Sequence, residues 1–316
     1  MKNTNQAQFK LPIIVAEDLS LADASARKRT LAVHLTAKWL SDLLHADVQL
    51  VHVENTSLLP VDRPLYQAGI RQFVATQLEG LKSIAFKYAN HAKTLILPGD
   101  PTETLIRLAK QKTKFSHLVM GTHGRKGLAR FFLGSTAEEV IRHATIPVVS
   151  VGPVAQLALS SKVISQRVFF LCSDLGSNSH AATEYAIALS KTLKFKLIIA
   201  HSLFEDIHPV MKAALASPTT AAELTSHFEE VRIEAAKRIE VLAKRLKKLK
   251  IEHRIEISDE NRSGHESLLA LIKTHKPAAV IAGTHGRNLA LNAFLGSTAR
   301  HLIHHSPCPV ITVRSK

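Results

Sequence analysis

The chain of 316 residues is long enough for two domains of about 150 residues each. Its composition, 46% hydrophobic and 21% charged, excludes a disordered or fibrous protein. The formal net charge of +15 attracts anions such as nucleotides, nucleic acid or acidic lipid head groups, without selecting one of them. No segment has the apolar length of a membrane span, and the first ten residues are too polar for a signal peptide, so we expect a cytoplasmic protein.

Short apolar runs alternate with longer segments of helical periodicity, a pattern typical of βαβ units and of a parallel sheet. Their continuous apolar character indicates strands that are buried on both faces. In the first half we expect strands at Ile13 to Ala16, Val48 to Val53, Thr94 to Leu97, His117 to Met120 and Pro147 to Val151. We expect helices near Asp23 to His45, Tyr66 to Asn90, Thr102 to Lys110 and Ser135 to His143.

The second half repeats this order of elements. We expect its strands at Val168 to Leu171, Lys196 to Ala200, His253 to Ile257, Ala279 to Ala282 and Pro309 to Val313. A long helix is expected from about Thr220 to Lys250, where lysines and arginines interleave with apolar residues at helical spacing. That pattern predicts an amphipathic helix with a solvated basic face. Cys172 and Cys308 lie in apolar, strand-like segments, so we assign them to the core and give them no function.

An internal repeat sets the organisation of the chain. The sequence GTHGR at 121–125 recurs at 283–287, FLGSTA at 132–137 recurs at 294–299, and Pro-Val-Val at 147–149 is matched by Pro-Val-Ile at 309–311. We therefore predict two tandem Rossmann-like, doubly wound α/β domains, each a five-stranded parallel sheet flanked by helices. Their expected bounds are 1–155 and 166–316, with a linker of small and polar residues at 156–165. The ligand crevice of such a domain lies beyond the carboxyl ends of its strands.

A loop that follows the fourth strand of each half carries the strongest chemical signal. Its glycines stand at Gly121, Gly124 and Gly134 in the first half and at Gly283, Gly286 and Gly296 in the second. Such glycines allow positive φ and a close approach of a ligand, and the helix that follows offers free N–H groups to an anion. Hydroxyl groups from Ser135, Thr136, Ser297 and Thr298 and positive charge from Arg125 and Arg287 suit phosphate. A tight strand-to-helix turn is the simpler interpretation, but the repetition of the whole spacing favours a phosphate site.

The spacing G-x2-G-x9-G-[ST] after strand four, with an aspartate ending strand one, resembles the ATP-binding class of the universal stress protein family (UspA-like), over nearly the whole chain. The resemblance implies that Asp18 or Asp174 hydrogen-bonds adenine and that the backbone near Val53 and Ser202 contacts the base. It also implies that Gly121 or Gly283 lies near the ribose and that the other glycines, serines and threonines of the loop surround the phosphates. The implied ligand is ATP, AMP or another adenine nucleotide, with or without Mg²⁺.

The same resemblance implies a role in stress tolerance and signalling, little or slow hydrolysis, and pairing of domains as a dimer or a tandem pseudo-dimer. Two departures predict unequal halves. Glu17 stands beside Asp18, where it would add negative charge near the base. The turn Gly99-Asp-Pro-Thr-Glu103 after strand three becomes the longer and more polar segment 258–264 in the second half. The sequence leaves open whether one half or both bind nucleotide.

The same residues also bear on other functions. His123 and His285 lie in the loop, but no nucleophile or orienting carboxylate accompanies them, so we expect no catalytic residue. A receiver domain, a P-loop ATPase and a Rossmann dehydrogenase each lack their defining residues, and no metal site is expected. Three alternatives stay open: a nucleotide-independent scaffold, salt-sensitive nucleic-acid binding through the basic helix, and slow ATP hydrolysis. A homodimer is equally open.

Overall fold

The computed structural model describes residues 8–19, 24–55, 64–85, 92–122, 133–158, 166–176, 179–204, 207, 220–258, 263–284 and 295–315. The strands of the first half are β1 (Ile13–Glu17), β2 (Val48–Glu54), β3 (Ala92–Pro98), β4 (His117–Gly121) and β5 (Val148–Val151). Those of the second half are β6 (Val168–Cys172), β7 (Lys196–Ser202), β8 (His253–Ser258), β9 (Ala279–Gly283) and β10 (Val310–Val313). Every expected strand is present, within two residues of its predicted ends.

The helices of the first half are α2 (Ala24–Leu44), α3 (Pro64–Ala85), α4 (Pro101–Ala109), α5 (Ser135–His143) and α6 (Pro153–Ala158). Those of the second half are α8 (His180–Leu193), α10 (Ala221–Lys248), α11 (Gly264–His275) and α12 (Ser297–His305). The short helix α6 was not expected. It occupies the first residues of the predicted linker, whose remaining residues 159–165 lie outside the described part of the chain, so the domain bounds stay a prediction.

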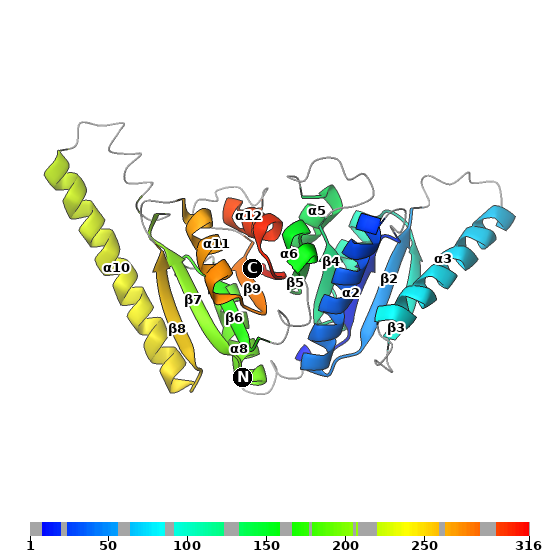
Figure 1. Ribbon diagram of the computed structural model, residues 1–316, viewed down its shortest axis with the longest axis horizontal. Helices are drawn as coiled ribbons and strands as arrows, with labels where there is room; N and C mark the ends of the chain where they lie inside the picture. Colours follow the sequence, from blue (N-terminus) through cyan, green and yellow to red (C-terminus); the bar gives the residue numbers. More distant parts are fainter. Residues whose placement is uncertain are drawn as a thin grey trace.

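All ten described strands join one sheet in the order β3-β2-β1-β4-β5-β10-β9-β6-β7-β8. Strands are parallel within each half, and the halves meet where β5 and β10 pair antiparallel, with Val149 opposite Ile311. Figure 1 shows the result: two similar α/β units side by side, with α5, α6 and α12 near the centre and α3 and α10 at the outer ends. The predicted fold, two tandem doubly wound domains, is confirmed, and the two sheets are continuous.

Two hydrophobic cores lie on opposite faces of the sheet. Ile13 and Val15 of β1 belong to the core on the face that α2, α8 and α10 cover, whereas Ile14 between them belongs to the core on the face of α4, α5, α11 and α12. Consecutive residues of a strand point to opposite faces, so burial on both faces explains the continuous apolar runs in the sequence. Cys172, which ends β6, and Cys308, which precedes β10, are buried free thiols in the second core. No helix in the described part of the chain combines the length and the hydropathy needed to cross a bilayer.

Helix α10 has the predicted amphipathic character. Its inner side contributes Leu246 to the core, while several of its basic residues form ion pairs with nearby carboxylates. These pairs are Arg232 with Glu229, Arg238 with Glu234, Lys244 with Glu240, and Arg245 with Glu184 of α8. The basic face is therefore partly neutralised by the protein itself, as expected of a solvated surface.

The amino end of α10 is fixed by a capping box. The hydroxyl of Thr220 accepts a hydrogen bond from the backbone N–H of Glu223, and the Glu223 carboxylate accepts one from the backbone N–H of Thr220. We expect Thr220→Ala to lower the free energy of unfolding by about 1 kcal/mol. Urea unfolding followed by circular dichroism checks this, with Ser226→Ala in the exposed helix interior as the control. Equal effects of the two substitutions would contradict a role for the cap.

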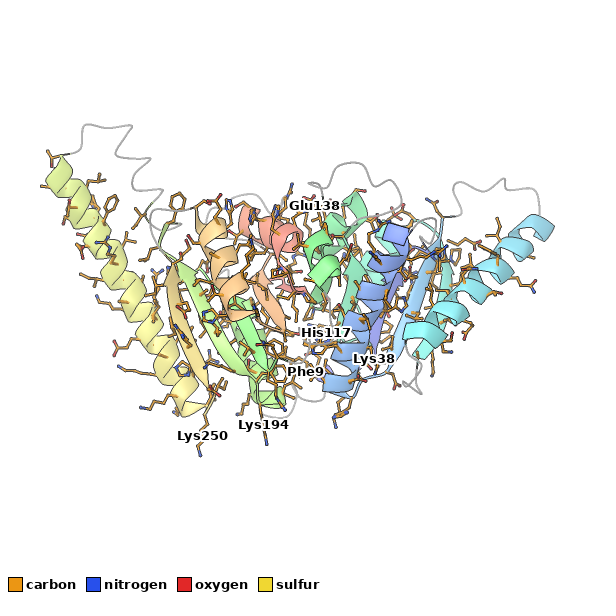
Figure 2. The ribbon with its side chains drawn as sticks, in the orientation of Figure 1. Phe9, Lys38, His117, Glu138, Lys194 and Lys250 are labelled. Atoms are coloured by element: carbon orange, nitrogen blue, oxygen red, sulfur yellow. The ribbon has the colours of Figure 1, made fainter. Side chains whose placement is uncertain are left out.

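A buried aromatic cluster joins the halves at the amino edge of the sheet. His117, the first residue of β4, forms a 2.6 Å hydrogen bond between its Nε2 and the hydroxyl of Tyr185 on α8. Phe9 lies 6.1 Å from the His117 ring and 5.9 Å from the Tyr185 ring, measured between centroids. Phe9 and His117 are labelled in Figure 2. Burial lowers the pKa of His117 to about 3 and raises the pKa of Tyr185.

Candidate functional site

The candidate site of each half lies at the carboxyl edge of the sheet, where the strand order changes direction. In the first half β1 lies between β2 and β4, so the connections from β1 and from β4 leave toward opposite faces. In the second half β6 holds the same place between β7 and β9. Ligands of doubly wound sheets bind at this switch point, in agreement with the crevice expected from the sequence.

The glycine loop begins and ends at this edge in both halves. Gly121 ends β4 and Gly283 ends β9, and the loop closes where the backbone N–H of Gly134 donates to the carbonyl of Thr122 at 2.9 Å. Gly296 donates to the carbonyl of Thr284 at the same distance. Gly124, Arg125, Gly286 and Arg287, with His123 and His285, lie outside the described residues. The placement of phosphate around them stays a prediction.

The glycines at 134 and 296 do not adopt the positive φ that we expected of the loop. Gly134 has φ −61° and Gly296 has φ −57°, so neither adopts positive φ, and Gly99, with φ 128°, is the positive-φ glycine of the described residues. Close approach explains Gly134 instead. A Cβ there would lie 3.0 Å from the carbonyl oxygen of Thr122, tighter than ordinary contact.

The glycines at 134 and 296 are also the N-cap residues of α5 and α12. Within the described residues neither helix has a hydrogen bond from a capping side chain, so no N-cap side chain competes with a ligand for the first-turn N–H groups. Ser135 and Ser297 are exposed, and Thr136 and Thr298 are half-buried. The hydroxyls of Thr136 and Thr102 lie 3.0 Å apart, which ties α5 to α4. The arrangement provides oriented N–H donors and the positive end of a helix dipole, both of which suit an anionic oxygen.

The end of strand one has the same backbone shape in both halves. Leu19 and Leu175, which follow the two aspartates, both have φ 55°. Asp18 is exposed, whereas Asp174 is half-buried and accepts a hydrogen bond from the backbone N–H of Gly176 at 2.9 Å. The two carboxylates that the resemblance assigns to adenine therefore have different surroundings.

The side chain of Glu17 packs into the core against α2, and its effect on the predicted base site stays a prediction. Its side chain is buried, with Oε2 2.8 Å from Nε2 of His34 on α2 and Oε1 accepting the backbone N–H of Leu19 at 3.0 Å. The reason is strand alternation: Glu17 shares the face of Ile13 and Val15, which packs against α2. In the second half Ser173 holds this position and lies 2.9 Å from the hydroxyl of Ser179.

Two histidines that the sequence analysis missed position the same edge. Nδ1 of His52 donates to the carbonyl of Glu17 at 2.9 Å, and Nδ1 of His201 donates to the carbonyl of Ser173 at 2.9 Å. Both side chains are buried, and both histidines directly precede the predicted base-contact residues, Val53 and Ser202. They fix the end of strand one to the end of strand two. Their recurrence at matching positions of the repeat was the available signal.

The two halves differ in the side chains near the amino end of α12 and the corresponding end of α5. The rings of His265 and His301 lie 4.3 Å apart, as do those of His301 and His305, where the first half has Thr102, Glu139 and His143. Desolvation, followed by the nearby histidines, lowers the pKa of His301 to about 4. Among the described residues no group of three or more His, Cys, Asp or Glu is arranged to hold a metal ion. The two halves thus differ in the side chains beside these helix termini, and the predicted difference in nucleotide affinity stays a prediction.

Comparisons with known proteins agree with this architecture. A universal stress protein from Archaeoglobus fulgidus has a TM-score of 0.63 at 18% identity and covers 96% of this chain and 98% of its own. A functionally unknown protein of Pseudomonas aeruginosa has a TM-score of 0.56 at 13% identity and covers 98% of this chain and 94% of its own. Both likenesses show the fold.

Sequence relatives cover less of the molecule. A universal stress protein of Methanocaldococcus jannaschii is 39% identical over 74 residues, which are 23% of this chain. An uncharacterized protein of Schizosaccharomyces pombe is 26% identical over 187 residues, which are 58% of this chain. This chain spans 43% and 29% of the lengths of these two curated relatives.

The family itself is shown by a match that occurs twice. The model of the universal stress protein family matches residues 12–152 and again residues 169–314, one match for each half of the repeat. The two matches include both glycine loops, both aspartates at the end of strand one, and the two histidines that donate to the carbonyl of the residue before each aspartate. The chain thus belongs to the universal stress protein family, with two copies of the family's domain in tandem.

Proposed function

We propose that this protein binds ATP or another adenine nucleotide at the carboxyl edge of one or both halves, and acts in the stress response as a nucleotide-dependent sensor or signalling protein. One observation carries the proposal: in each half a glycine-capped helix terminus opens at the switch point, beside the end of strand one. Phosphate is the ligand that such a terminus suits best. The glycine spacing and the strand-one aspartates, by their resemblance to the ATP-binding class, supply the expectation of adenine.

The proposed roles divide along the crevice. The first-turn N–H groups of α5 and α12, with Ser135 and Ser297, would face the phosphates, with or without Mg²⁺ on the triphosphate. Asp18 or Asp174 and the backbone at Val53 or Ser202 would face the base. His52 or His201 would hold the ends of these two strands together.

The partial neutralisation of α10 by its own carboxylates gives nucleic-acid binding no support.

We expect an aspartate at the N-cap to block this site. Gly134 and Gly296 have backbone angles suited to a capping side chain, so Gly134→Asp and Gly296→Asp would offer their own carboxylates to the N–H groups and repel phosphate. Thermal unfolding with and without ATP, AMP or GTP measures the result. At about a hundred times its dissociation constant a ligand adds roughly 2.7 kcal/mol to the domain it binds. Each aspartate should remove that gain from its own half.

Alanine variants separate the effect of the added carboxylate from the effect of the added Cβ. Gly134→Ala introduces the same Cβ near the Thr122 carbonyl without the carboxylate, so it should keep more of the ATP shift than Gly134→Asp. Equal nucleotide shifts in the wild type and both aspartate variants would place the ligand elsewhere. No shift in the wild type, with no nucleotide present after purification, would favour a nucleotide-independent scaffold.

A further inference from the structure

The interface between the halves brings equivalent positions face to face. Val149 of β5 pairs with Ile311 of β10, and these two residues occupy the same place in the repeat. Likewise Ser150 pairs with Val310, and Val148 with Thr312. A local two-fold axis therefore passes through the centre of the ten-stranded sheet. In an interface of this kind a residue near the axis meets its own counterpart.

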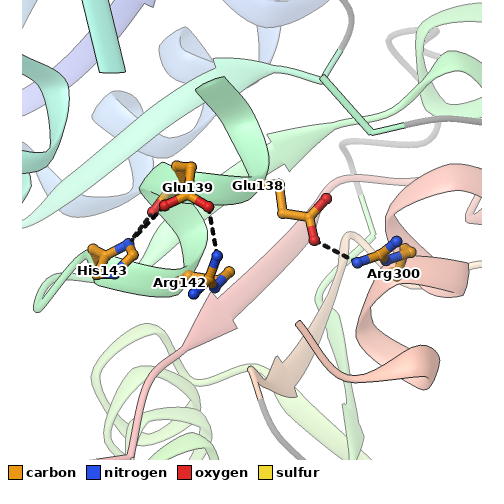
Figure 3. Close-up of polar contacts among 5 residues, drawn as sticks. All are labelled: Glu138, Glu139, Arg142, His143 and Arg300. Carbon is orange, nitrogen blue, oxygen red and sulfur yellow. Dashed lines mark hydrogen bonds and ion pairs between the residues drawn. The ribbon is translucent and has the colours of Figure 1, made fainter. Parts of the chain in front are cut away.

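Opposite charges occupy one such pair of counterparts. Glu138 is the fourth residue of α5 and Arg300 is the fourth residue of α12, and an Arg300 guanidinium nitrogen donates to Oε1 of Glu138. Figure 3 shows this pair, with Glu139 turned to Arg142 and His143 of its own helix. The side chains are 22% and 41% exposed, so water screens the pair only in part.

If two identical halves paired, the ion pair between Glu138 and Arg300 would be lost. Two first halves would place Glu138 against Glu138, and two second halves would place Arg300 against Arg300. Like charges that meet across an interface suppress the wrong partner. Opposite charges at equivalent positions are thus possible only where a first half meets a second half.

The backbone near the axis adds a steric requirement. A Cβ at Gly152, just after β5, would lie 1.8 Å from the carbonyl oxygen of Ile303 in α12, so only glycine fits there. The counterpart of Gly152 in the repeat is Arg314. Arg314 carries a Cβ at the equivalent place, so the close contact of Gly152 with α12 belongs to one side of the axis only.

We propose that the face formed by β5, α5 and α6 is a partner-selective surface that accepts only a domain with a cation at the position of Arg300, which is the second half of this same chain. It rejects another first half, and the matching face of the second half rejects another second half. The inference concerns the pairing of domains and does not depend on nucleotide binding.

Single charge reversals in the full chain recreate the like-charge contacts. Glu138→Arg places arginine against Arg300, and Arg300→Glu places glutamate against Glu138. Each should lower the folding equilibrium constant about tenfold, and the double reversal should recover it to within about threefold. The loss should shrink at high salt. Urea unfolding at two salt concentrations measures all four proteins.

Mixing the two single variants tests partner choice directly. Refolded together, Glu138→Arg and Arg300→Glu chains can restore opposite charges by pairing between chains, and native mass spectrometry should show a mixed dimer. The control mixture combines Glu184→Arg with Arg245→Glu, which disrupts an ion pair within one half that pairing between chains cannot restore. We expect at least about tenfold more mixed dimer in the first mixture. Equal dimer fractions in the two mixtures, or single variants as stable as the wild type, would overturn the proposal.

Discussion

Replacing Gly152 with alanine is expected to lower the free energy of unfolding by about 3 kcal/mol, a large effect for the addition of one methyl group. The Cβ would lie 1.8 Å from the carbonyl oxygen of Ile303 and 3.0 Å from its carbonyl carbon. A backbone carbonyl within a helix cannot rotate away as a flexible side chain can. Either α12 shifts or the segment between β5 and α6 moves, and both disturb the junction of the two halves.

Gly80→Ala is the matched control. Gly80 lies within α3, it is exposed, and nothing lies within 4 Å of the Cβ position. Alanine there should stabilise the protein by up to about 1 kcal/mol, because glycine is a poor helix former. Urea unfolding of the two variants and the wild type gives the comparison. A Gly152→Ala protein as stable as the wild type would show that the close approach of β5 and α12 is wrong.

Acidification is expected to destabilise the protein through His117. The pKa of this buried side chain is about 3 in the folded protein, against an ordinary value of 6.5. Between these values the unfolded chain binds a proton that the folded chain refuses. The free energy of unfolding therefore falls as the pH is lowered from about 6.5 through 3, and the full loss is about 5 kcal/mol. Above pH 6.5 this contribution is constant.

Two variants separate the effect of burying the His117 imidazole from the effect of its hydrogen bond to Tyr185. Tyr185→Phe removes the hydroxyl that contacts His117 but keeps the imidazole buried, so most of the pH dependence should remain. His117→Leu combined with Tyr185→Phe removes the titrating group without stranding the hydroxyl, and should flatten the profile. His301, with its pKa lowered to about 4, titrates in all these proteins and cancels in the comparison. Identical profiles of the single and double variants would exclude His117 as the source.

The fold could be predicted because its signals are local and occur twice. Strands such as Ile13–Glu17 are apolar on both faces, and the helices between them keep their period over many residues. The side-chain directions were harder. Glu17 follows the alternation of β1 into the core, and placing it at the crevice beside Asp18 ignored that alternation. Similarly, Gly134 is required by the nearby Thr122 carbonyl and not by positive φ.

Contacts between the halves were beyond the reach of sequence patterns. An edge strand such as Val148–Val151 has the same apolar composition whether it pairs with its counterpart or with a second chain. The hydrogen bond between His117 and Tyr185 joins residues of different halves that no periodicity connects. His52 and His201 were within reach, because a histidine recurs at the end of strand two in each half.

The junction between β5 and β10 also sets how the protein responds to dilution. A dimer of separate subunits dissociates once its concentration falls below its dissociation constant, and its folded stability falls with it. Here the two paired strands belong to one chain, so each finds its partner at an effective concentration fixed by the covalent connection. The continuous sheet therefore persists when only a few copies of the protein are present in a cell.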